Sequence, residues 1–108
     1  MIMQQECQDI LNALMPGFPF DGWRICIELK ELRDDNPNES NSALTVFSDA
    51  LRVAIMYIDP RYPKPYEFFT LKQIIAHELG HICLRETMDE EYSATMIGEL
   101  ISKLSEQH

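Results

Sequence analysis

The chain has 108 residues, of which 45% are hydrophobic and 25% charged, and these values predict one small globular domain spanning residues 1–108. Its net charge of −9, without a basic stripe, argues against nucleic acid as a partner. It has no recognisable secretory signal and no apolar run of transmembrane length, so we expect no membrane partner either.

The first half of the chain predicts a helix followed by strands. Apolar residues recur every three or four positions in residues 2–15, which indicates an amphipathic helix that ends at Pro16-Gly17. Residues 23–30 alternate between apolar and polar side chains, as in a half-buried strand. After a polar, exposed loop at residues 31–42, segments 43–47 and 51–58 are predicted to form a hairpin.

The second half predicts two helices. Asp59-Pro60 ends the sheet, and residues 60–66 form a stiff, proline-rich connector. Thr70 is the expected N-cap of a helix that continues to about Arg85. Asp89 is the expected cap of a last helix, whose buried stripe should contain Met96, Ile97, Leu100, Ile101 and Leu104. The order is therefore α-β-β-β-α-α, and the fold class is α+β.

The three cysteines are widely spaced and odd in number, which argues against a disulfide framework. They favour a cytoplasmic protein with reduced thiols. We expect Cys7 to lie in the core and Cys26 to be a partly exposed thiol. Cys83 lies about 160° around its helix from His81, so we expect it to face the core.

The chemically informative feature is the run His77-Glu78-Leu79-Gly80-His81 in the middle of the first of these two helices. Residues four apart on a helix lie one turn apart on the same face, so His77 and His81 can reach one metal ion. Zinc accepts nitrogen and carboxylate ligands. Glu78 lies at the edge of that face, where its carboxylate can act on a metal-bound water as a general base.

A catalytic zinc ion needs a third protein ligand, and the sequence offers several. Position 87, where some zinc peptidases carry a third histidine, is Thr87. If the last helix folds back beside the first, Glu91 can face the two imidazoles, whereas Glu90 lies about 100° away and is expected to face solvent. The other residues of suitable type are Glu86, Asp89, Cys7, Cys26 and His108.

The motif, followed ten residues later by Glu91, resembles that of gluzincin metallopeptidases. It is most similar to their minimal forms, the minigluzincins and ImmA/IrrE-like peptidases, over residues 70–105. The resemblance implies a zincin-like fold, with a twisted sheet over an active-site helix and the substrate along an edge strand. It also implies one Zn²⁺ bound by His77, His81 and Glu91, with Glu78 as the catalytic base. The expected function is zinc-dependent endopeptidase activity on a protein or peptide substrate.

A second hypothesis is that the chain is a zinc-binding latent or regulatory module with little turnover. In that case its own tail, with His108 as a metal ligand, or a partner would inhibit it. For an enzyme, a tyrosine could donate a hydrogen bond to the oxyanion, and the sequence does not select among Tyr57, Tyr62, Tyr66 and Tyr92.

Overall fold

The structure is a computed structural model that describes residues 2–32, 43–60, 70–84 and 91–106, apart from the side chains of residues 91–94 and 96. The α+β class and the predicted order of elements are confirmed. The elements are α1 (Gln4–Leu14), a 3-10 turn η1 (Met15–Gly17), β1 (Arg24–Leu29), β2 (Ala43–Ser48), β3 (Val53–Ile58), α2 (Leu71–Leu84) and α3 (Glu91–Glu106). Three parts of the prediction lie outside the described residues: loop residues 33–42, connector residues 61–66, and Asp89.

The three strands form a mixed sheet in the order β1-β3-β2. The predicted hairpin is confirmed: β2 pairs antiparallel with β3, and Thr45 lies opposite Met56. β1 pairs with the other side of β3 in parallel. At the tip of the hairpin, Arg52 has a φ of 54°, in the left-handed region where a glycine is more usual. Because β3 lies between β1 and β2, the strand β2 forms one edge of the described sheet.

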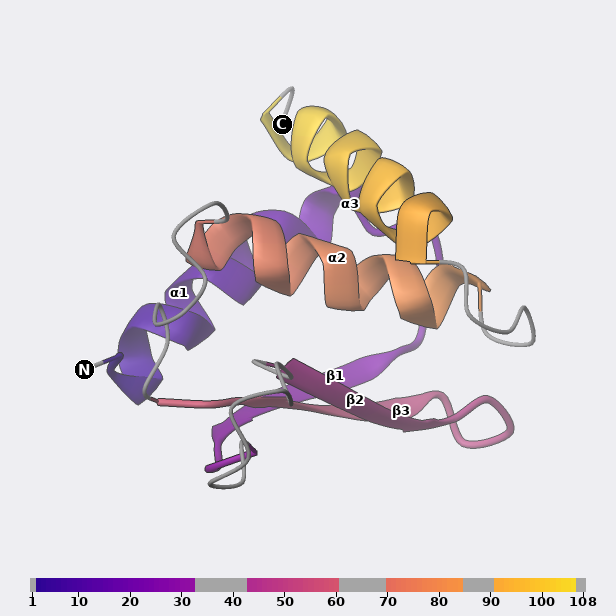
Figure 1. Ribbon diagram of the computed structural model, residues 1–108. Coiled ribbons are helices and arrows are strands. Elements are labelled where there is room, and N and C mark those ends of the chain that lie inside the picture. Colours follow the sequence, from indigo (N-terminus) through magenta and orange to yellow (C-terminus); the bar gives the residue numbers. More distant parts are fainter. Residues whose placement is uncertain (1, 33–42, 61–69, 85–90, 107–108) are drawn as a thin grey trace.

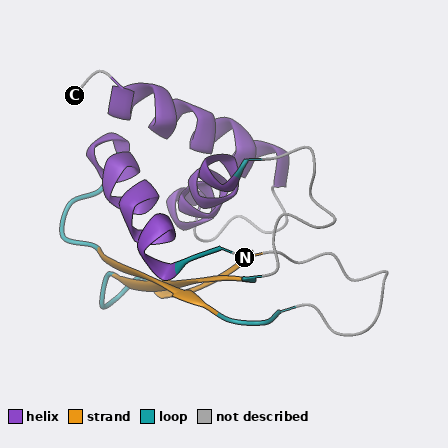
Figure 2. Ribbon diagram, turned by 90° about the vertical axis from the view of Figure 1, so that its left-hand side faces the viewer, coloured by secondary structure: helices purple, strands orange, loops and turns teal. Residues whose placement is uncertain are grey.

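The helices α1, α2 and α3 all lie on one face of the sheet (Figures 1 and 2). The side chains of β1 alternate as predicted, with Ile27 buried and Cys26 exposed. Each large apolar side chain in the core contributes about 1.5–3 kcal/mol. The fully buried apolar residues between helices and sheet include Leu11, Leu14, Met56, Ile58, Ile75, Leu79, Ile82 and Ile101.

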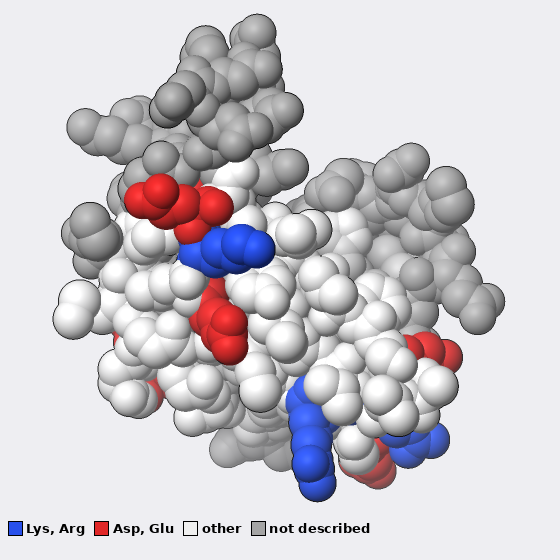
Figure 3. All heavy atoms as spheres, turned by 90° about the horizontal axis from the view of Figure 1, so that it is seen from below, with Lys and Arg blue, Asp and Glu red and all other residues white. Residues whose placement is uncertain are grey.

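The opposite face of the sheet carries aliphatic side chains that the described part of the chain leaves exposed, including Leu44, Val46 and Val53. Figure 3 views the molecule from this side and shows mainly uncharged residues, with a few charged side chains among them. Tyr57 belongs to this face too, with the Lys30 Nζ 5.0 Å from the centre of its ring. The site described below lies on the other face, between sheet and helices. None of the described helices is both long enough and apolar enough to span a bilayer.

The start of α2 follows the prediction that Thr70 caps the helix. The Gln73 amide donates to Thr70 Oγ1 at 3.1 Å, and the Thr70 amide donates to the Gln73 side-chain oxygen at 2.8 Å. This reciprocal pair is a capping box. It fixes where α2 begins.

The buried stripe predicted for α3 is wrong at two positions. Ile101 is buried and Ile97 packs against the core, but Leu100 and Leu104 are 57% and 47% exposed. α3 packs against α2 and η1 along one side. The buried stripe on its surface is therefore narrower than predicted, and it leaves out Leu100 and Leu104. The side chain of Met96 is not described.

The close contact between α2 and α3 depends on Gly98. A Cβ atom at this position would lie 2.6 Å from the Ala76 carbonyl oxygen and 2.9 Å from the His77 amide nitrogen. Neither backbone atom can move without shifting α2. Gly98 therefore lets α3 lie directly against the part of α2 that carries His77.

We expect Gly98→Ala to destabilise the protein by about 1–3 kcal/mol, because the added methyl group overpacks this contact. Helix propensity alone predicts the opposite sign, a gain of about 1 kcal/mol. Urea unfolding measures the difference, with Glu99→Ala at the neighbouring exposed position as the control. A Gly98→Ala variant as stable as the wild type would contradict the close packing.

The far end of α3 is held by Ser105. Its Oγ lies 2.7 Å from the Leu14 carbonyl oxygen and 2.8 Å from the Ile101 carbonyl oxygen, and it accepts a hydrogen bond from the Gly17 amide at 3.0 Å. Ser105 thus ties α3 to the end of α1. A truncation that tests inhibition by the tail should keep Ser105, because removing it would also weaken this junction.

Cys7 lies in the core, as predicted, and its thiol is sensitive to high pH. Burial, and secondarily the charge of Glu6, raise the pKa of the Cys7 thiol from 9.0 to about 11. The stability gained from the protonated thiol is complete below pH 9 and is lost as the pH rises towards 11.

Between pH 9 and 11 we therefore expect the free energy of unfolding of the wild type to fall, and that of Cys7→Ala to fall less. Urea unfolding at pH 8 to 11 tests this, with exposed Cys26→Ala as the control; equal pH dependence in the wild type and Cys7→Ala would be the contrary result.

Candidate metal centre

The two histidines of the motif converge on one point. His77 and His81 lie one turn apart on α2, both partly buried, and their Nε2 atoms are 3.0 Å apart. Their ring centres are 4.6 Å apart and the ring planes are inclined by 83°. Two nitrogens bound to one tetrahedral zinc ion at about 2.0–2.1 Å would lie about 3.3 Å apart. The observed 3.0 Å is the length of a hydrogen bond between the two rings, and an outward shift of a few tenths of an ångström would give the spacing of two zinc ligands.

Glu78 completes a compact group with these histidines. One ligand atom from each of His77, Glu78 and His81 can be chosen so that all three lie within 4.8 Å of one another. These three side chains are of the types that bind metal ions, and they lie close enough together to hold one. Glu78 is only 7% exposed, which is unusual for a carboxylate. It lies beside the two imidazoles, so its carboxylate is near enough to act on a bound ion or on a water molecule next to it.

The orientation of His77 is fixed from α3. His77 Nδ1 lies 2.8 Å from Thr95 Oγ1. A metal-binding histidine commonly donates its second ring N–H to an oxygen acceptor, which fixes the ring and the tautomer. If His77 Nδ1 donates to Thr95, its Nε2 presents a lone pair to the metal. In that tautomer, the contact with Thr95 matches the outer contact common to metal-binding histidines.

Glu78 is held from the sheet. Thr45 Oγ1, on the strand β2, donates a hydrogen bond to Glu78 Oε1 at 2.6 Å. Neither Thr45 nor Thr95 was singled out from the sequence. A weak signal existed for Thr45, a polar residue at an inward position of a predicted strand between Ala43 and Phe47. For Thr95 the signal was its position one turn after Glu91.

The third ligand is the part of the predicted site that the structure leaves open. The side chain of Glu91 is not described, and Glu90, Thr87 and His108 lie outside the described residues. The backbone position of residue 91 is nevertheless informative. It begins α3 and precedes Thr95 by four residues, so both positions lie on the same face of the helix. Thr95, on this face of α3, contacts His77.

Other sequence candidates do not reach the group. Cys26 is exposed on β1, on the face of the sheet opposite α2, and Cys7 is buried in α1. Cys83 packs against the core, as predicted. Tyr57 also points away from the histidines, because it follows buried Met56 by one position on β3. The structure therefore removes Tyr57 from the possible oxyanion donors; Tyr62, Tyr66 and the Tyr92 side chain are not described.

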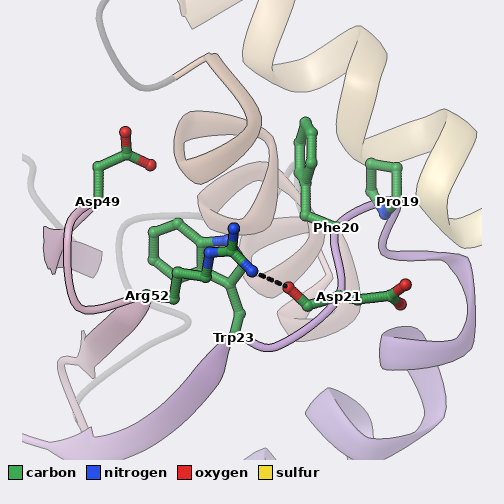
Figure 4. A pocket seen from close by; sticks show the side chains of 6 residues that line it. All are labelled: Pro19, Phe20, Asp21, Trp23, Asp49 and Arg52. Atoms are coloured by element: carbon green, nitrogen blue, oxygen red, sulfur yellow. Dashed lines mark hydrogen bonds between the residues drawn. The ribbon is translucent and has the colours of Figure 1, made fainter.

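A separate hollow of about 370 Å³ lies between the turn before β1 and the tip of the β2–β3 hairpin (Figure 4). Arg52 Nη1 donates to the Asp21 carbonyl oxygen at 3.5 Å, which joins the two segments. The lining of this hollow contains no histidine or cysteine, and it does not include His77, Glu78 or His81. The lining residues are Pro19, Phe20, Asp21, Trp23, Asp49 and Arg52.

No family model, curated protein or solved structure matches this chain.

Proposed function

We propose that this protein is a zinc-dependent endopeptidase of minimal, gluzincin-like type. The observation that carries the proposal is the convergence of the His77 and His81 Nε2 atoms, 3.0 Å apart, beside the buried carboxylate of Glu78. His77 and His81 would hold the zinc ion, and Glu91 is the proposed third ligand. When bound, zinc acidifies a water molecule and polarises the carbonyl group of the substrate.

In this proposal Glu78 moves the proton. Its carboxylate accepts a proton from the water that attacks the peptide carbonyl, and then delivers it to the nitrogen of the leaving amine. Burial suits this role, because a carboxylate at the site is shielded from bulk water while the reaction proceeds. Thr95 would keep the His77 ring in place throughout.

The proposed substrate is an extended peptide. The edge of β2 that does not pair with β3 is unpaired among the described strands, and such an edge can accept a peptide as an added strand. Thr45 of the same strand contacts Glu78, so a peptide on this edge would lie next to the proposed base.

The proposed location is the cytoplasm. The three cysteines are free, which is consistent with a reducing compartment.

Cleavage of casein and of a peptide library by the zinc-loaded chain tests the proposal. We expect cleavage that stops when a chelator is added and returns when zinc is restored. Zinc uptake at the histidines without cleavage of any substrate would instead favour the latent or regulatory module. If zinc does not bind, both functions are excluded.

A further inference from the structure

The buried Glu78 carboxylate is placed where it could serve either as a base or as a ligand. A Glu78 oxygen lies within 4.8 Å of a ring nitrogen of each histidine. A rotation of the side chain could therefore bring the carboxylate into the coordination sphere of a bound ion, where its lone pairs would be occupied. The proposed reaction requires that Glu78 stay beside the ion without binding it.

Thr45 supplies a restraint of the right kind. Its hydroxyl donates to Glu78 Oε1 at 2.6 Å, within the range of short hydrogen bonds to an ionised carboxylate. It is presented by a strand, paired residue by residue with β3, and its β-branched side chain has few rotamers. The donor is consequently fixed in space by the sheet, independently of α2.

We propose that Thr45 is a positioning residue for Glu78, which holds one carboxylate oxygen and so keeps the side chain as a base and prevents it from becoming a metal ligand. The inference rests on the proposed function. The Thr45 hydroxyl bonds to Glu78, whereas the hydrogen bonds given for the two histidine rings join them to Thr95 and to each other. Loss of the Thr45 hydroxyl should therefore reduce turnover without weakening zinc binding.

Three single variants separate the hydroxyl from other effects. Thr45→Val keeps the shape and removes the hydroxyl, and Thr45→Ser keeps the hydroxyl and removes the methyl group. Val53→Thr is the control, since it changes an exposed valine on the central strand β3, outside the proposed peptide-binding edge. In Thr45→Val we expect kcat to fall about 10-fold or more with KM close to wild type. Zinc affinity should equal that of the wild type or exceed it, because a coordinating Glu78 would add a ligand. Thr45→Ser and Val53→Thr should retain wild-type kcat.

Cobalt(II) substitution gives a readout that does not depend on activity, because the visible spectrum reports coordination number and ligand type. We expect the spectrum of cobalt-loaded Thr45→Val to differ from wild type, and the added change Glu78→Gln to restore it. A wild-type kcat and spectrum in Thr45→Val would overturn the inference, as would a loss in Thr45→Ser as large as in Thr45→Val. If the wild type itself does not cleave but the spectra behave as expected, the proposed function fails and the positioning role of Thr45 stands.

Discussion

Glu78→Gln is expected to lower zinc-dependent cleavage by about 10²–10⁴-fold while zinc remains bound. The amide cannot accept a proton from the attacking water, yet it has nearly the size of the carboxylate. Its carbonyl oxygen can still accept the hydrogen bond from Thr45, so the surroundings of the site should be retained. The measurement is kcat/KM on one cleaved peptide, together with zinc content after dialysis.

Glu99→Gln provides the matched control for this change. Glu99 is exposed on α3, so its substitution makes the same chemical change outside the site. We expect its cleavage rate and zinc content to equal those of the wild type. Zinc-dependent cleavage retained in Glu78→Gln would falsify the assignment of Glu78 as the base.

His81→Ala is expected to weaken zinc binding by more than about 100-fold, because it removes one of the two proposed nitrogen ligands. Loss of an outer partner that only orients a ligand typically costs about 10–100-fold, and loss of the ligand itself costs more. Thr95→Val, which removes the oxygen beside His77 Nδ1, should therefore give a smaller loss. Competition against a chromogenic chelator measures all three affinities.

Thermal unfolding gives an independent measure of the same prediction. Zinc at about 100 times its Kd should stabilise the wild-type chain by about 2.7 kcal/mol, because the ion binds the folded state. The same zinc concentration should leave the stability of His81→Ala almost unchanged. Equal stabilisation of both proteins would place the zinc somewhere other than on His81.

The sequence predicted most of the elements, because their signals are local. The alternation of residues 23–30 identified the buried side of β1, and Thr70 marked the start of α2. The spacing of His77 and His81 predicted their convergence, since helix geometry alone brings residues four apart onto one face. These features depend on neighbours within a few positions, and the structure retains them.

The features that were missed depend on contacts between distant segments. Thr45 and Glu78 are 33 residues apart, and His77 and Thr95 are 18 apart. The parallel pairing of β1 with β3 and the exposure of Leu100 also depend on how whole elements pack. Gly98 left only an indirect signal, since a glycine inside a helix often has a packing reason.

Anomalous diffraction at the zinc edge, from crystals of the zinc-loaded chain, tests the proposed metal centre most directly. We expect one strong peak per chain, about 2.0–2.1 Å from the Nε2 atoms of His77 and His81, with the Glu91 carboxylate also bound and Glu78 nearby but not bound. A peak at any other place in the chain, or the two Nε2 atoms facing each other with no ion between them, would contradict a zinc site formed by these histidines.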